Sequence, residues 1–478
     1  MPILRGAVRI RTRQDVDAWL SGLENFERMP PAGPPEAAYG LIRMRRLLEV
    51  LGSPHRRYGI VHVAGTKGKG STVAMIASIL QQGGYRVGRY MSPHVHDLEE
   101  RICVDDRPIA GADFAKTCRR VARAVDRLTT RDHSSVPTWF EAVTAMAMLY
   151  FSTRRVSIAV LETGLGGRLD ATNVCDPLVT VITSVSLDHT AQLGRTVRAI
   201  AHEKAGIIKP GKPVVSGARV ASAARVVASA ASATVSPLYL LGRDFHVSIG
   251  PTHSSEKGFQ RRARGRRGAG GFTSLAGPTL SIDLGSLAGR DETPTVSRLG
   301  MAGTHHADNA GLAVAAVRLL AREGFSIDSP AVERGLASVR LPARVELIDA
   351  RPPVVVDAAH NVASMQSLVD TLITAGVPSG AVLVFSAARD KQVRKMLQSA
   401  RAIFKTVVLT RFTSNARALD CKSLLMAARR AGFRATHVVE PPLEALAKAR
   451  SLAGPQGCVC VAGSFFLAGE LRRAALQS

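Results

Sequence analysis

The sequence predicts an α/β protein with two domains, the first built on a parallel central sheet and the second a doubly wound α/β domain. Two observations predict this fold class. A glycine-rich loop at 65–70 lies between a β-branched apolar run and a helical pattern. After residue 349, short apolar runs alternate with helical patterns, which is typical of a parallel sheet covered by helices. A length of 478 residues also favours two domains.

The glycine-rich loop belongs to the segment IVHVAGTKGKGST at 60–72. Glycines allow backbone N–H groups to approach an anion, the following helix adds partial positive charge at its N-terminus, and Lys69 can reach terminal phosphates. Gly70 separates Lys69 from Ser71, which departs from the usual G-x-x-x-x-G-K-[ST] pattern. We interpret the segment as a phosphate-binding loop. A glycine loop without a ligand is the less favoured alternative, because strand, lysine and helix accompany it.

The remaining elements of the first domain follow from apolar periodicity. Helices are predicted at 40–51 and 111–129, and a core-facing helix carries Trp139, Val143, Met146 and Tyr150 at helical spacing. The pattern then weakens, so residues 221–300 are predicted to be irregular β structure and loops. A clear helix is predicted at 303–322.

Two further apolar strands of this domain end in residues that suit metal binding. Residues 156–161 lead into Glu162, and a second run leads into Asp188 and His189. Because ligands bind at the carboxyl ends of parallel strands, we expect Gly65, Glu162 and His189 to converge. A carboxylate beside a phosphate loop can hold the Mg²⁺ that neutralises phosphate charge. A surface carboxylate and a structural histidine are the alternatives.

Other polar residues are weak candidates on spacing alone. Ser92 lies in a Ser-Pro-His turn after a strand, and Lys204 lies on a predicted helix, where most lysines are solvated. Asp357 and His360 lie at a strand-to-helix turn of the second domain. The aspartate could bind ribose hydroxyls and the histidine could stack on a base. A structural cap at this turn is an equally good interpretation.

The second domain is predicted to begin after a linker. The predicted boundaries are 1–340 for the first domain, with a basic loop insertion at about 252–272, then a linker at 341–348 and the second domain at 349–478. Within the second domain, helices are predicted at 362–375, 390–402, 418–431, 442–453 and 465–475.

Composition limits the classes of partner. The chain holds 63 Lys and Arg against 38 Asp and Glu, a formal net charge of +25. Nucleic-acid binding must therefore be considered, but the sharpest basic cluster, 259–271, has few aromatic residues and favours a solvated loop. General positive potential also attracts polyanionic small molecules. The longest apolar runs are too short to span a membrane, so no membrane partner is expected.

Cysteines and the N-terminus bear on location. The six cysteines are scattered without a C-x-x-C motif, which indicates reduced thiols rather than disulfides or zinc. The N-terminal residues lack the apolar segment of a secretory signal. A cytoplasmic location and a monomer are expected.

Taken together, the motifs resemble the folylpolyglutamate synthase/dihydrofolate synthase family of the Mur ligase superfamily. The resemblance runs over nearly the whole chain and rests on HVAGTKGKGST, SPH, TWFEAVT, LETGLGGRLDATN, IAHEKAGIIK, LPARVEL and DAAHN. It implies a P-loop ATPase domain followed by a smaller Rossmann-like domain, with ATP in the cleft between them. Two departures stand out: Lys67 replaces the usual asparagine, and His306 replaces the usual glutamine.

The resemblance also implies roles for individual residues. Ser92 and Glu162 match the ligands of one Mg²⁺ and His189 a ligand of a second, and Lys204 matches a lysine that CO₂ carbamylates. Lys69, Lys204 and His189 are the implied catalytic residues. The implied ATP contacts are Gly65, Thr66, Gly68, Lys69, Gly70, Ser71, Asn309, Arg344, Asp357 and His360.

The implied activity is an ATP-dependent ligase that adds L-glutamate to a folate-type carboxylate, tetrahydrofolate polyglutamate or dihydropteroate, through an acyl phosphate. Two alternatives stay open: another Mur-type amino-acid ligase acting on a cell-wall precursor, and a basic P-loop protein that binds nucleic acid. The sequence does not distinguish dihydropteroate from reduced folate, and it does not assign a role to Lys67 or to 259–271.

Overall fold

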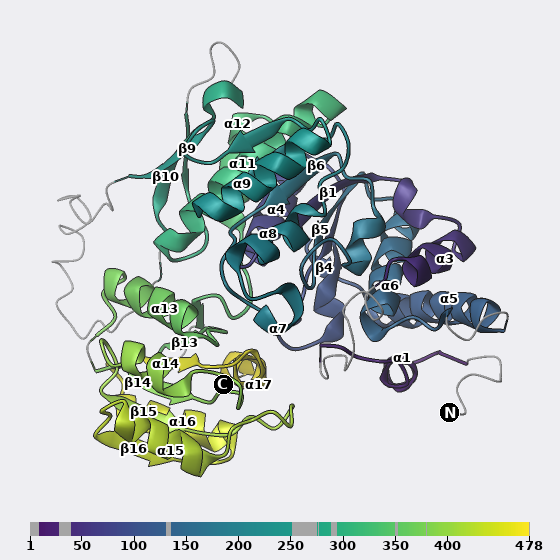
Figure 1. Ribbon diagram of the computed structural model, residues 1–478. Helices are drawn as coiled ribbons and strands as arrows, with labels where there is room; N and C mark the ends of the chain where they lie inside the picture. Colours follow the sequence, from purple (N-terminus) through teal and green to yellow (C-terminus); the bar gives the residue numbers. More distant parts are fainter. Residues whose placement is uncertain are drawn as a thin grey trace. The chain divides into compact units, whose positions relative to one another are not determined.

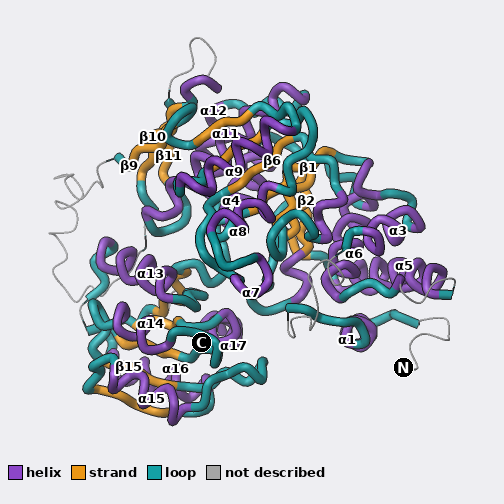
Figure 2. The backbone as a smooth tube through the Cα atoms, in the orientation of Figure 1, coloured by secondary structure: helices purple, strands orange, loops and turns teal. Residues whose placement is uncertain are grey.

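The computed structural model divides the chain into two compact units (Figures 1 and 2). Unit 1 comprises Met1–Ser248, Ser281–Ser297 and Ala307–Ser338, and unit 2 comprises Ile249–Leu280, Arg298–His306 and Val339–Ser478. The structure describes residues 9–27, 40–130, 135–250, 275, 277–287, 294–348, 352–378 and 380–477. The predicted basic insertion at 252–272 therefore lies entirely outside the described residues.

Unit 1 is built on an eight-stranded sheet with the order β4-β3-β2-β5-β1-β6-β7-β8. Its strands are β1 (Gly59–Ala64), β2 (Val87–Tyr90), β3 (Ile102–Val104), β4 (Arg107–Pro108), β5 (Ile158–Glu162), β6 (Val179–Ile182), β7 (Val214–Ser216) and β8 (Leu238–Leu240). From β2 to β8 neighbouring strands are parallel, and β3 and β4 extend the edge with antiparallel pairs. The predicted parallel sheet is thus confirmed, and β1 lies between β5 and β6.

Helices cover this sheet. They are α1 (Arg13–Ser21), α3 (Ile42–Val50), α4 (Lys69–Gln82), α5 (Gly111–Thr129), α6 (Trp139–Thr153), α7 (Thr190–Leu193), α8 (Val197–Ala205), α9 (Ala221–Ala233), α11 (Ala307–Leu320) and α12 (Ser329–Ser338). Short 3-10 helices are η1 (Pro54–Arg56), η2 (Leu98–Arg101), η4 (Ala171–Val174), η5 (Gly285–Leu287) and η7 (Ala321–Glu323). Helix α4 packs on β1, β2 and β5, and α11 packs on β6, β7 and α4 (Figure 1). All four predicted core residues of α6 are buried.

Two predictions for unit 1 were wrong. Residues 221–233 form helix α9 rather than irregular structure, because an alanine-rich segment favours helix and buries a narrow stripe of Ala223, Val227 and Ala231. The strand expected to lead into Asp188 ends at Ile182. The residues after it turn toward the loop that follows β1, as described below.

Unit 2 holds a six-stranded sheet with the order β12-β13-β17-β14-β15-β16. Its strands are β12 (Glu346–Ile348), β13 (Val354–Val356), β14 (Val382–Phe385), β15 (Thr406–Leu409), β16 (Ala435–Val438) and β17 (Val459–Ala462). All neighbours are parallel except β12, which pairs antiparallel with β13. The helices that alternate with these strands are α13 (Val362–Thr374), α14 (Val393–Ala400), α15 (Cys421–Arg430), α16 (Pro442–Ala453) and α17 (Phe465–Gln477). A short 3-10 helix, η6 (Thr304–His306), precedes this sheet in the chain.

The regular βα alternation predicted for the second half of the chain is therefore confirmed. Residues 346–348, which were predicted as part of a linker, form β12 instead.

A separate three-stranded sheet has the order β11-β10-β9, with β9 (His246–Ile249), β10 (Thr279–Asp283) and β11 (Thr295–Arg298). Within the described residues, no helix has both the length and the apolar character needed to cross a membrane.

Candidate functional site

The glycine loop after β1 leads directly into α4. Gly68 is the N-cap of α4 and has a left-handed backbone with φ +85°. A Cβ atom at this position would collide with Oδ1 of Asn309, which α11 carries. Only glycine therefore allows this turn and this close approach together. The structure brings Asn309, a residue that the resemblance places at the ATP site, against the loop.

Gly70, the third glycine of the loop, lies beside a carboxylate at the start of α4. Glu162 is the last residue of β5 and is 4% exposed. A Cβ at Gly70 would lie 3.4 Å from its Oε2, an ordinary contact distance, so the carboxylate lies directly beside this glycine. Lys69 Nζ lies 3.9 Å from Oε1, and the Ser92 backbone N–H donates to Oε2 at 3.2 Å. Lys69, Ser92 and Glu162 thus meet at the N-terminus of α4, where negative charge is favourable.

The residues after β6 hold the loop backbone. The Thr183 hydroxyl donates to the Lys67 carbonyl oxygen at 2.7 Å, and the Ser184 hydroxyl accepts from the Lys67 N–H at 3.1 Å. The Thr66 N–H donates to the Ser184 carbonyl at 2.6 Å. These contacts fix the loop before any ligand binds. Sequence reasoning missed Thr183 and Ser184, although small hydroxyl residues directly after a buried strand are a usable signal.

Lys204 lies beneath the loop. It is 4% exposed on α8, and its Nζ donates to the Gly65 carbonyl at 2.9 Å. Burial, with a smaller contribution from the Lys69 charge, lowers the pKa of Lys204 to about 7. The weak alternative of a solvated helix lysine is therefore wrong for this residue. A buried amine of this pKa is partly neutral at physiological pH.

His189 lies beyond the end of β6 rather than at it. It has a left-handed backbone with φ +47° and is the N-cap of the short helix α7. Its side chain is 59% exposed, and its Nε2 lies 4.0 Å from a carboxylate oxygen of Asp188. The expected convergence of three strand ends therefore holds for the loop and for Glu162. His189 lies on the segment that connects β6 to α7, not at the end of a strand.

The donor set at Glu162 suits Mg²⁺. This cation prefers oxygen ligands and is usually held by one or two carboxylates together with substrate phosphates and water. A buried carboxylate beside a phosphate-type loop and the Ser92 turn provides this chemistry. Among the described residues, no cluster of three or more His, Cys, Asp or Glu could hold a metal without other ligands. The residues present thus fit a metal that arrives with a phosphate.

In unit 2, two predicted residues lie near one aromatic ring, and a third, Asp357, interacts electrostatically with one of them. The Arg344 guanidinium carbon lies 4.8 Å from the centre of the Phe465 ring, and the His360 ring centre lies 5.2 Å from it. The Asp357 carboxylate accepts the Val345 N–H at 2.8 Å and the Ala359 N–H at 2.7 Å. Phe465 is a residue that sequence reasoning missed, since a single aromatic at a helix start carries no pattern.

The contacts of Asp357 favour the structural interpretation of this residue. Both of its carboxylate oxygens accept backbone N–H groups, so it ties the end of β13 to residue 345. Burial raises the pKa of Asp357, while the Arg344 guanidinium and the two backbone hydrogen bonds oppose that rise. The N-cap of α13 is Asn361, whose side chain accepts the Ser364 N–H. Binding to a ribose would use the lone pairs that remain on Asp357.

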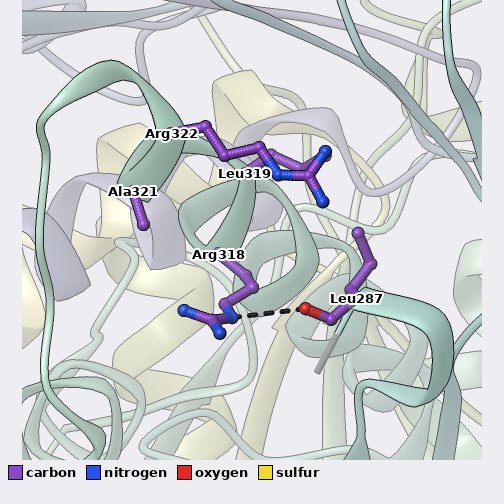
Figure 3. Close-up of a pocket in the computed structure, with 5 residues that line it drawn as sticks. All are labelled: Leu287, Arg318, Leu319, Ala321 and Arg322. Carbon is purple, nitrogen blue, oxygen red and sulfur yellow. Dashed lines mark hydrogen bonds between the residues drawn. The ribbon is translucent and has the colours of Figure 1, made fainter. Parts of the chain in front are cut away.

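A separate cavity of unit 1 lies apart from these residues. Its volume is about 260 Å³, and Leu287, Arg318, Leu319, Ala321 and Arg322 line it (Figure 3). Arg318 Nε donates to the Leu287 carbonyl oxygen at 3.3 Å. None of the sequence-predicted site residues lines this cavity, so it is not the candidate site.

Comparison with known proteins gives consistent matches over most of the chain. Residues 63–244 match the Mur ligase middle domain, and residues 343–465 match the Mur ligase glutamate ligase domain. The chain is 33% identical over 462 residues to the dihydrofolate synthase/folylpolyglutamate synthase of Bacillus subtilis, covering 96% of this chain and 98% of that one.

Solved structures agree with these matches. A Mycobacterium tuberculosis folylpolyglutamate synthase complexed with ADP superposes with a TM-score of 0.81 at 30% identity, over 97% of this chain and 98% of that one. E. coli FolC in complex with DHPP and ADP superposes with a TM-score of 0.79 at 25% identity, over 99% and 100%. The similarity therefore extends through both units rather than through one motif.

Proposed function

Because this chain belongs to the folylpolyglutamate synthase/dihydrofolate synthase family of Mur ligases, we propose that it joins L-glutamate to a folate-type carboxylate while ATP is cleaved to ADP and phosphate. One observation supports this most directly. The loop at the start of α4 sets Lys69 3.9 Å from the buried Glu162 carboxylate. A cation and a carboxylate at a helix N-terminus suit a nucleotide triphosphate with its metal.

The reaction proceeds in two steps. An oxygen of the folate-type carboxylate attacks the terminal phosphorus of ATP, the bond to ADP breaks, and an acyl phosphate forms. The amine of glutamate then attacks the acyl carbon, an amide forms, and phosphate leaves. The Lys69 ammonium and the N–H groups at the start of α4 stabilise the negative charge that develops on the phosphate oxygens. The fixed loop backbone keeps these groups in place.

Magnesium ions belong to the same proposal. Glu162 and Ser92 would hold one Mg²⁺ and His189, beside Asp188, would contribute to a second. A bound Mg²⁺ neutralises phosphate charge and so favours attack by an anionic carboxylate. The residues of the chain orient the phosphates, since the loop N–H groups and Lys69 contact them directly.

We propose ATP contacts for further residues of both units. Gly65, Thr66, Gly68, Gly70, Ser71 and Asn309 would contact the phosphates of ATP, and Arg344, Asp357 and His360 would contact the rest of the nucleotide. We also propose that the chain has domain boundaries at 1–340 and 349–478, is a monomer and is located in the cytoplasm. Lys67 would add a phosphate contact in the loop.

The proposed activity is tested by ADP release with dihydropteroate and with tetrahydrofolate, each with and without L-glutamate. We expect release to require ATP, glutamate and at least one of the two pterin substrates. The pterin substrate that supports the faster ADP release is the preferred acceptor of glutamate. Release that requires a cell-wall precursor instead, or salt-sensitive nucleic-acid binding with no ligase activity, would favour the alternative functions and contradict this one.

Lys204 is proposed to carry a carbamate. The Lys204 ammonium first loses a proton, the neutral amine attacks CO₂, a second N–H proton leaves, and an anionic carbamate forms beside the metal site. Its burial against Gly65 and near Lys69 supports this, because an anion there faces positive charge. Since the lysine pKa is about 7, the reactive neutral amine becomes more abundant as pH rises through this value.

The carbamate is tested by ¹³C NMR of protein equilibrated with ¹³C-labelled bicarbonate. We expect a carbamate signal that grows between pH 6 and 8 and disappears in Lys204→Met. The exposed Lys116 of α5 provides the matched control, Lys116→Met, which should keep the signal. An identical signal in wild type and Lys204→Met would disprove the assignment.

A further inference from the structure

Arg101 is a buried cation of unit 1 whose three guanidinium nitrogens all donate hydrogen bonds. It is the last residue of η2 and is 1% exposed. Its two terminal nitrogens donate to the two carboxylate oxygens of Glu27, each at 2.8 Å, and its guanidinium carbon lies 4.8 Å from the centre of the Trp139 ring. Since apolar residues can often replace a buried ion pair without loss of stability, this pair calls for an explanation beyond packing.

The third nitrogen of Arg101 holds His94. Arg101 Nε donates to the Nδ1 of His94 at 2.9 Å. Because a guanidinium only donates, Nδ1 must accept, and the neutral His94 ring therefore carries its proton on Nε2. The backbone carbonyl of Arg101 also accepts the Met91 N–H at 3.1 Å. Arg101 thus contacts the chain on both sides of Ser92. We name residues 92–94 the Ser92 turn.

The Ser92 turn contacts the carboxylate of the candidate metal site. The Ser92 N–H donates to the Oε2 of Glu162 at 3.2 Å. Burial opposes the charge of Arg101, but the Glu27 carboxylate, with smaller contributions from Tyr90 and Glu162, raises the Arg101 pKa above its ordinary value. The guanidinium is therefore a permanent charge that interacts electrostatically with Glu162. One buried residue is connected in this way to both groups of the site.

The residues that follow the Ser92 turn are fixed without the Arg101 side chain. The Glu100 carboxylate accepts the N–H groups of Val95, His96 and Asp97 at 2.9, 3.2 and 3.1 Å. These contacts tie residues 95–97 to η2 independently of the guanidinium. A change of the Arg101 side chain should therefore release the Ser92 turn without undoing the rest of this segment.

We propose that Arg101 is a positioning residue of the metal site, which holds the Ser92 turn through His94 while Glu27 fixes its guanidinium. This inference rests on the proposed function, in which Ser92 and Glu162 bind one Mg²⁺. Groups that hydrogen-bond to the surroundings of metal ligands orient those ligands, and their loss weakens metal binding although they do not touch the metal. Arg101 has this place, because it contacts the Ser92 turn and is itself fixed by Glu27.

The variant Arg101→Lys tests this role because it keeps the positive charge. A lysine ammonium cannot reproduce the planar fork that contacts Glu27 and His94 at the same time. We expect the dissociation constant for Mn²⁺, measured by electron paramagnetic resonance on the full chain with saturating ADP, to rise about tenfold. A purely structural arginine would lower the unfolding temperature but leave this constant within about twofold of the wild type, and that result overturns the inference.

The variant His94→Leu tests whether Arg101 acts through His94. It removes the acceptor of the Arg101 Nε, so we expect Mn²⁺ binding to weaken by about tenfold here too. The double variant should bind no more weakly than either single variant, because residues of one hydrogen-bond network have non-additive effects. If the two losses multiply to about 100-fold, Arg101 acts independently of His94 and the assignment is wrong.

The matched control is Arg472→Lys in unit 2. Arg472 makes the same kind of two-pronged contact with Glu346, through Nε at 2.7 Å and a terminal nitrogen at 2.8 Å. This variant should leave the Mn²⁺ dissociation constant unchanged. If Arg101→Lys does not fold, Glu27→Gln takes its place, since its amide offers the guanidinium one oxygen instead of two. We expect a smaller weakening of Mn²⁺ binding there, and an unchanged constant overturns the inference.

The variant Glu162→Gln separates failure of this inference from failure of the proposed function. If Glu162→Gln weakens Mn²⁺ binding and Arg101→Lys does not, the metal site stands and Arg101 is not its positioning residue. If neither variant changes Mn²⁺ binding, the proposed metal site is wrong and this inference fails with it. Folate- and glutamate-dependent ADP release by the wild type reports on the ligase activity independently.

Discussion

Replacing Lys69 by alanine will reduce folate- and glutamate-dependent ADP release by about 10³-fold, the upper range for loss of one preorganised charge-stabilising donor. Lys69 is the first residue of α4, so its side chain starts at a helix N-terminus, where a phosphate is favourable. Among the described ion pairs, Lys69 has one acidic partner, Glu162, whose Oε1 lies 3.9 Å from the Lys69 Nζ. That separation leaves the ammonium able to contact a phosphate.

Two further variants define this expectation. Alanine is a strong helix former, so Lys69→Ala should preserve α4 and the unfolding temperature. Lys116→Ala removes an exposed lysine of α5 and should keep full activity. Lys69→Arg keeps the charge but changes its geometry, and an intermediate loss is expected. Steady-state ADP release with saturating pterin and glutamate provides the measurement. Full activity of Lys69→Ala would contradict the proposed role of the loop.

Replacing Glu162 by glutamine will have the second largest effect. The amide keeps the shape of the side chain beside Gly70 and can still accept the Ser92 N–H, but it removes the negative charge. We expect activity to fall by about 10²- to 10³-fold at millimolar Mg²⁺, because a neutral ligand binds the cation weakly. Raising the Mg²⁺ concentration should recover part of this loss. Mn²⁺ binding measured by electron paramagnetic resonance should weaken in parallel.

The matched control for Glu162 is a carboxylate with a comparable local role. Glu470 accepts the N–H groups of Thr413 and Ser414, each at 2.8 Å, within unit 2. Glu470→Gln should therefore show only a small change in stability and an unaltered Mg²⁺ dependence. If Glu162→Gln had the same Mg²⁺ dependence as the wild type, its carboxylate would not be a metal ligand.

The two wrong predictions for unit 1 have one cause: the local sequence pattern fits more than one secondary structure. Residues 221–233 carry alanine and serine with few large apolar side chains, so their periodicity is weak although their helix propensity is high. The run after β6 contains apolar residues beyond Ile182, which suggested a longer strand. In the structure, the hydroxyls of Thr183 and Ser184 bond the Lys67 backbone instead. A hydrogen bond to a distant segment ends this strand, and no local pattern encodes that.

The sequence alone determined the strand, glycine loop and helix around Lys69, the strand leading into Glu162 and the βα alternation of the second half. Apolar periodicity and glycine spacing record these features within a few neighbouring residues. Only the tertiary structure decided that Lys204 lies beneath Gly65, 139 positions away, and that Asn309 closes over Gly68. Strand order and helix packing fix such pairs, and these depend on contacts between segments far apart in the chain.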